Sequence, residues 1–69
     1  MDEFRFDLWL QKELKKRKMR QTDLAKLAQL HQSTVFYLVH NQRLPRLETV
    51  LLVLDALGMH LEIVNNEKQ

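Results

Sequence analysis

The chain has 69 residues, no cysteine and a formal net charge of +2. A domain of this size buries only about 60% of its unfolded surface, so a disulfide, a metal ion or a partner subunit usually supplements its core. The missing cysteines exclude disulfides, and His31, His40 and His60 lack the paired spacing of metal ligands. We therefore expect one domain over residues 1–69, with no metal site, that gains stability by forming an oligomer.

The charge is distributed unevenly along the chain. Residues 12–46 hold nine basic and two acidic residues, a net charge of +7, whereas residues 1–11 carry −2 and residues 47–69 carry −3. A positive centre between negative ends is what binding to phosphate groups requires. The densest basic run, Lys15 to Lys18, is by itself more typical of a solvated helix end. The phosphate-binding interpretation therefore depends on the elements around it.

The N-terminal part of the sequence predicts a first helix. Its apolar stripe recurs at i, i+4 and i+8 and consists of Phe6, Leu10 and Leu14. We expect it to begin near Asp2 or Asp7, because carboxylates favour the positive end of a helix. It should end among Lys16 to Lys18, where cations favour the negative end.

Residues 21–39 predict two short helices joined by a tight turn. The apolar stripe of the first consists of Leu24, Leu27 and Ala28. The second begins near Gln32 and is lined by Val35, Leu38 and Val39. Leu30 lies in the three-residue break between them as an apolar plug. Two helices of about two turns with such a break predict a helix-turn-helix unit.

A fourth helix is predicted from about Leu47 to Leu57, ending at Gly58, after a polar loop in which Asn41 can adopt the left-handed conformation. This helix is apolar almost all round, which indicates burial on more than one side. A chain this short cannot cover both sides alone. We therefore expect a dimer interface that includes Leu52 and Val53.

Residues 59–64 predict a short C-terminal strand, because apolar and polar side chains alternate strictly from Met59 through Ile63. Its apolar face would consist of Met59, Leu61 and Ile63, which we add to the dimer interface. A lone strand is not stable, so we expect it to pair with the same strand of a second subunit. The alternative is an extended tail packed on its own domain.

The stretch from Gln21 to Val39 resembles the helix-turn-helix of phage-repressor-like, Xre-type regulators, and the resemblance extends from about Leu10 to Gly58. It rests on the glutamine that opens the second helix, the small Ala25, the plug Leu30, and Gln-Ser-Thr at residues 32–34. It implies a mostly α, lambda-repressor-like bundle that binds double-stranded DNA. A palindromic operator would then match a homodimer.

The third helix would present its first turn to the major groove. The candidate base-reading residues are Gln32, Ser33, Phe36 and Tyr37. Glutamine pairs bidentately with adenine, serine donates or accepts, and an exposed aromatic ring contacts a thymine methyl. Phe36 could instead be a core residue, but helical spacing favours exposure. The candidate DNA-backbone contacts are Arg20, Gln21, Asn41, Arg43 and Arg46. The resemblance also implies that Gln21 braces Gln32.

The sequence departs from the family pattern at several positions. Lys18 and Gln29 stand where relatives often have glycine, so we expect backbone strain or a different turn there. Leu14 and Val39 stand where relatives commonly pair an arginine with a glutamate. Apolar replacement of a buried ion pair is often neutral or stabilising.

The C-terminal strand is similar to that of HipB-like antitoxins, a resemblance that implies repression of the protein's own operon and a toxin as partner. The alternatives are a phage Cro or repressor-like regulator without a toxin, or a protein-interaction module on a helix-turn-helix scaffold. An enzyme is not expected, because the chain has no phosphate loop, no cysteine nucleophile and too few residues to enclose a pocket. We expect no cofactor, no membrane association and a cytoplasmic location.

Overall fold

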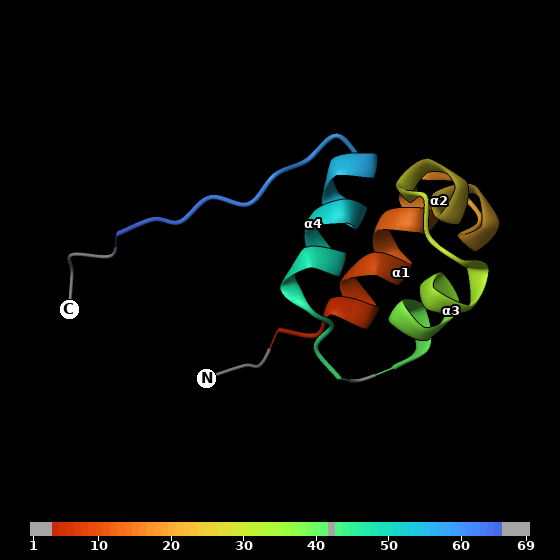
Figure 1. Cartoon of the computed structure of the whole chain (residues 1–69), viewed down its shortest axis with the longest axis horizontal. Helices are drawn as coiled ribbons and strands as arrows, with labels where there is room; N and C mark the ends of the chain where they lie inside the picture. The colour runs from red at the N-terminus through yellow and green to blue at the C-terminus, as the bar shows by residue number, and fades with distance from the viewer. Residues whose placement is uncertain (1–3, 42, 66–69) are drawn as a thin grey trace.

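The computed structural model describes residues 4–41 and 43–65 and contains four helices (Figure 1). In chain order they are α1 (Phe6–Arg17), α2 (Gln21–Ala28), α3 (Gln32–His40) and α4 (Leu47–Ala56). The prediction of a small α-helical bundle is confirmed, and the break between α2 and α3 spans the three residues expected. In the described ranges no residue belongs to a β-strand, so the single chain does not contain the C-terminal strand.

The helices are held together by one apolar core. α1 packs against α3, and α2 packs against both α3 and α4. Each helix contributes one side chain without exposed surface: Leu10, Leu24, Val35 and Val53. Burying a side chain of this kind contributes about 1.5–3 kcal/mol relative to exposure. Ala25, which is 3% exposed, belongs to the same core.

Two helices end in turns that favour glycine but contain none. Lys18 after α1 and Gln29 after α2 adopt left-handed conformations, with φ of 56° and 58°. Each turn is closed by backbone hydrogen bonds, including Met19 N–H to the Leu14 carbonyl at 2.9 Å and Leu30 N–H to the Ala25 carbonyl at 2.9 Å. A left-handed residue with a Cβ costs roughly 1–2 kcal/mol. The chain thus adopts left-handed turns at both positions and accepts the strain, as one of the two expected outcomes.

Asn41 does not adopt the left-handed conformation expected of it. Its φ of −110° and ψ of 131° are extended. Its side-chain oxygen instead accepts a hydrogen bond from the backbone N–H of Arg43 at 2.7 Å. The amide therefore shapes the loop after α3 through its side chain, a common use of asparagine in turns.

The start of α1 contains a buried carboxylate. Asp7 is 5% exposed and accepts hydrogen bonds from Arg5 Nε at 3.1 Å and Arg5 Nη2 at 2.8 Å. These bonds from the guanidinium lower the pKa of Asp7 below its ordinary value of 3.8, against the opposing effect of burial. The ion pair fixes the entry of the chain into α1.

This pair predicts a pH-dependent contribution to stability. Because the folded-state pKa of Asp7 is lowered, its contribution is present above pH 3.8 and is lost as the pH falls through the lower folded value. Asp7→Asn should therefore lower the melting temperature at pH 7 and change it little at pH 2. Thermal unfolding followed by circular dichroism measures this difference. A melting-temperature loss that is equal at both pH values would contradict the ion-pair interpretation.

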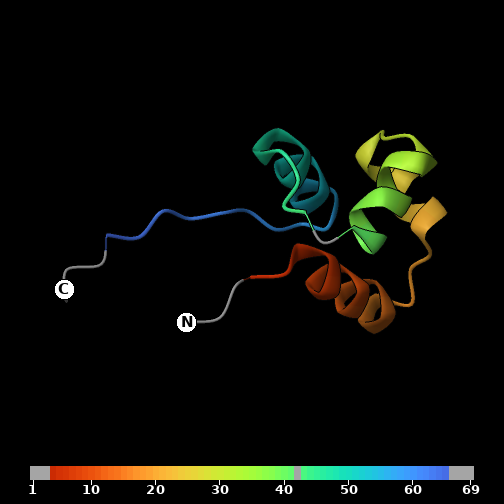
Figure 2. The same cartoon turned by 90° about the horizontal axis from the view of Figure 1, so that it is seen from below.

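The residues expected at a dimer interface are divided between core and surface. Val53 has no exposed surface because it packs in the core of its own chain, so it has none to offer a second subunit, and the prediction for Val53 fails. Leu52 is 48% exposed, Leu61 is 52% exposed and Ile63 is fully exposed. Met59 is half-buried and packs against the core. The segment after Gly58 leaves the bundle beside α4 (Figures 1 and 2).

Candidate nucleic-acid interface

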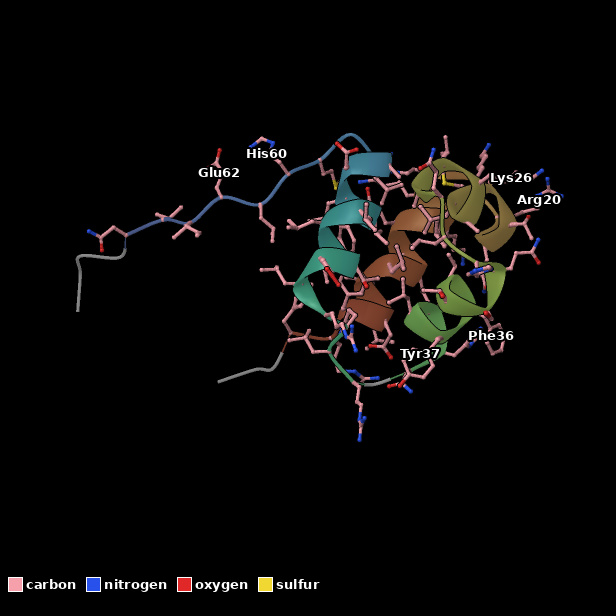
Figure 3. The ribbon with its side chains drawn as sticks, viewed as in Figure 1. Arg20, Lys26, Phe36, Tyr37, His60 and Glu62 are labelled. Atoms are coloured by element: carbon pink, nitrogen blue, oxygen red, sulfur yellow. The ribbon has the colours of Figure 1, made fainter. Side chains whose placement is uncertain are left out.

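The candidate interface begins with the two faces of α3. One face is buried in the bundle and consists of Val35, Leu38 and Val39. The opposite face consists of exposed side chains: Gln32, Ser33, Phe36, Tyr37 and His40. Phe36 is 58% exposed and Tyr37 50% exposed, so the expectation that Phe36 lies outside the core is confirmed. Figure 3 shows both rings on α3, at the end of the molecule away from the C-terminal tail.

The first turns of α2 and α3 meet around an open hollow of about 390 Å³. Its lining residues are Gln21, Thr22, Gln32, Ser33 and Phe36. The first turn of a helix leaves backbone N–H groups without helical partners, and the helix dipole is positive there. The hollow therefore combines polar side chains with the ends of two helices that favour an anion or a base edge.

Thr22 is a lining residue that sequence reasoning missed. It lies in the first turn of α2, directly after Gln21, and is half-buried. It lines the hollow together with three predicted base-reading residues, Gln32, Ser33 and Phe36. The available signal was its position, since a hydroxyl in the first helical turn lies next to the free N–H groups.

His40 connects the two helices at the other end of the exposed face. Its ring stacks on Phe36 with centroids 4.2 Å apart and planes tilted by 40°. Its Nε2 lies 3.5 Å from Gln21 Nε2. The expected bracing partner of Gln21 was Gln32. Those two glutamines line the same hollow, but the polar side-chain contact of Gln21 is with His40.

The residues expected to contact the DNA backbone lie in two places. Arg43 and Arg46 are exposed in the loop between α3 and α4, and Asn41 shapes that loop. Gln21 lies at the hollow, and Arg20 directly precedes it at the start of α2. The structure therefore does not gather all five into one cluster.

Arg20 is engaged by an acidic neighbour. Asp23 accepts hydrogen bonds from Arg20 Nε and Nη2, both at 3.2 Å, and from the Arg20 backbone N–H at 2.9 Å. These contacts raise the pKa of Arg20 and lower the pKa of Asp23. Because the pair is exposed, it contributes little to stability. It does offset part of the positive charge that Arg20 would bring to a phosphate.

The short α2, the three-residue turn and the outward face of α3 define a helix-turn-helix unit of DNA-binding type. A family model described as helix-turn-helix matches residues 10–64. The chain therefore belongs to this helix-turn-helix family, of the Xre, lambda-repressor-like type, whose members are DNA-binding transcription regulators. Comparisons with curated proteins and with solved structures give no match.

None of the helices in the described ranges is long and apolar enough to cross a membrane. The longest, α1, has 12 residues, whereas a span needs about 20.

Proposed function

We propose that the protein is a sequence-specific transcriptional repressor that binds a palindromic operator as a homodimer. The observation that carries this proposal is the hollow where the first turns of α2 and α3 meet, beside exposed rings on α3. A recognition helix reads the bases through its N-terminal residues, which enter the major groove. In this chain the polar side chains at that end of α3, Gln32 and Ser33, are exposed.

The base contacts follow from the chemistry of each side chain. Gln32 is suited to adenine N6 and N7, and Ser33 can donate to or accept from several bases. Phe36 and Tyr37 are suited to apolar contact with thymine methyl groups. His40 stacks on Phe36 and limits the orientations open to that ring.

The phosphate contacts surround this face. Gln21 lies at the free N–H groups of α2, and Arg43 and Arg46 project from the loop after α3. Residues 12–46 carry a net charge of +7, which attracts the duplex before any base is read. A pure protein-interaction module has no need of this charge in the segment that contains the polar hollow.

A finer proposal is that the protein is a HipB-like antitoxin that represses its own operon and binds a toxin. The exposed tail after α4 supports it, because its apolar residues Leu61 and Ile63 alternate with polar ones, as in the strand through which HipB-like antitoxins dimerise. A Cro-like regulator without a toxin is the alternative. Co-purification of the chain with the product of an adjacent gene distinguishes the two.

The proposal predicts cooperative binding to a two-fold site. Duplexes that tile the protein's own promoter region should show one tight site by fluorescence anisotropy, with half-sites about 34 Å or a small multiple apart. Sedimentation of the complex should give two chains per duplex. A shuffled duplex of the same composition is the control. Equal affinity for both duplexes, or one chain per site, would contradict the proposal.

A further inference from the structure

An apolar groove lies on the side of the molecule where the tail leaves the bundle, and its volume is about 260 Å³. Its lining residues are Phe4, Phe6 and Trp9 around the start of α1, Val50 and Leu54 of α4, and Met59, His60 and Leu61 of the tail. All but His60 are apolar. An apolar cavity of about 150 Å³ already accepts a molecule such as benzene, so this groove has room for a branched aliphatic side chain.

Past the groove the tail is exposed. Ile63 is fully exposed, although it has the same alternation phase as Met59 and Leu61, which line the groove. On the other phase, His60 Nε2 lies 3.2 Å from Glu62 Oε2. Figure 3 shows these two side chains on the same side of the tail. The tail thus has one apolar face, with Met59, Leu61 and Ile63, and one face that carries His60 and Glu62.

We propose that two tails pair antiparallel, centred on Leu61, and that Ile63 of each chain fills the groove of the other. This inference deepens the homodimer part of the proposed function by naming the register and the residue that occupies the groove. It commits to a second copy of this chain as the occupant.

The pairing of polar side chains across the two strands selects the register. Centring the pair on Leu61 places His60 opposite Glu62 of the partner subunit, and this pairing occurs twice by symmetry. A shift of two residues in one direction places Glu62 opposite Glu62, and two carboxylates directly opposite destabilise a sheet. A shift in the other direction places His60 opposite His60, so that neither ring has a carboxylate opposite it to accept its N–H. A shift of one residue would place the apolar residues of one strand on the same face of the sheet as the polar residues of the other.

The same register places a side chain over the groove. With Leu61 at the centre, Met59 lies opposite Ile63 of the partner subunit. Directly opposite residues have Cβ atoms about 4.5–5.5 Å apart and point to the same face. Because Met59 lines the groove, the partner's Ile63 points into it. The exposed apolar residue of one chain and the open apolar groove of the other are thereby both covered.

Disulfide trapping in the full-length chain tests the register, since the natural sequence has no cysteine. Met59→Cys mixed with Ile63→Cys should give a mixed crosslink under mild oxidation, and each variant alone should give little. Leu61→Cys alone should crosslink to itself. In this register the two copies of position 59, or of position 63, lie four residues apart along the paired strands, about 13 Å or more, too far for a disulfide. Lys26→Cys, at the other end of the molecule (Figure 3), controls for random collision.

The fluorescence of Trp9, the only tryptophan, tests the occupant. Ile63→Asp should raise the dimer dissociation constant about tenfold or more and should red-shift Trp9 emission at concentrations where the natural chain is dimeric. Val64→Asp is the matched control, because Val64 lies on the same face of the strand as His60 and Glu62, and it should leave the emission unchanged. Retained dimerisation with unchanged Trp9 emission in Ile63→Asp overturns the inference.

Two results separate this inference from the proposed function. A chain that binds its operator as a dimer but gives no mixed crosslink between positions 59 and 63 overturns the inference alone. A chain that gives the mixed crosslink and the Trp9 response but binds no duplex supports the inference and overturns the DNA-binding proposal.

Discussion

Leu14→Arg should lower the free energy of unfolding by about 3–5 kcal/mol, the cost of leaving one charge buried without a partner. Leu14 of α1 is 6% exposed and Val39 of α3 is 4% exposed, and both belong to the core between these helices. They also line one cavity together with Gln11, whose Nε2 donates to the Val39 carbonyl at 2.7 Å. The other lining residues are Met19, Arg20, Gln21 and Thr22, so a guanidinium placed there finds no carboxylate among them.

Adding Val39→Glu to Leu14→Arg should recover part of that loss. The pair would restore the charges that relatives commonly carry at these two places, and a carboxylate next to the guanidinium offsets its desolvation. Urea unfolding of the natural chain, both single variants and the double variant gives the coupling energy.

The measurements in this double-mutant cycle must allow for the small total stability of the natural chain. Domains have about 5–15 kcal/mol in all, so the Leu14→Arg chain is expected to be largely unfolded at 37 °C and should be measured at low temperature. Lys15→Arg, one residue along on the exposed side of α1, should have almost no effect. Equal loss in the single and double variants would show that the side chains at positions 14 and 39 do not interact.

The helix boundaries could be predicted because their signals are local. The i, i+4, i+8 spacing of α1 and the lysines at its end indicated both its face and its length, and α1 indeed ends at Arg17. The turn between α2 and α3 was indicated by an apolar plug between two short stripes. Each of these patterns lies within about ten residues, so no knowledge of the tertiary fold was needed.

The faces of the helices were harder to predict, because packing decides them. α4 is apolar almost all round, and its sequence does not indicate which side meets the core. In the structure Val53 is buried and Leu52 remains 48% exposed. Leu27 was placed on the buried stripe of α2 but is 57% exposed. In both helices, periodicity predicted an apolar stripe wider than the surface that its neighbours cover.

In the candidate site, too, some features could be predicted from local patterns and others depend on packing. The exposed residues of α3 could be predicted from helical spacing alone, since a buried face implies the opposite one. The contact between Gln21 and His40 could not, because it joins residues 19 positions apart through the angle between two helices. The extended conformation of Asn41 could not be predicted either: its backbone N–H donates to the Tyr37 carbonyl at 2.9 Å, and its side-chain oxygen accepts from the Arg43 N–H at 2.7 Å.

Gln32→Ala and Ser33→Ala should each relax sequence preference at one or two operator positions and cost about 1–3 kcal/mol per half-site. In a dimer the loss is counted twice, so a single substitution is expected to weaken operator binding by about 30-fold or more. Affinity for a shuffled duplex should hardly change. Both side chains are exposed in the first turn of α3, so the fold should be retained, which circular dichroism checks.

Arg43→Ala and Arg46→Ala provide the contrasting pair. These exposed loop residues are proposed to contact phosphate, so their loss should weaken operator and shuffled duplex alike and flatten the dependence of affinity on salt. Each substitution should reduce the salt slope by about one per half-site. Anisotropy titrations of all four variants on both duplexes, from low to physiological salt, measure preference and slope together. If the arginine variants lost sequence preference while the Gln32 and Ser33 variants lost only salt dependence, the loop after α3 would read the bases. The proposed docking of α3 would then be wrong.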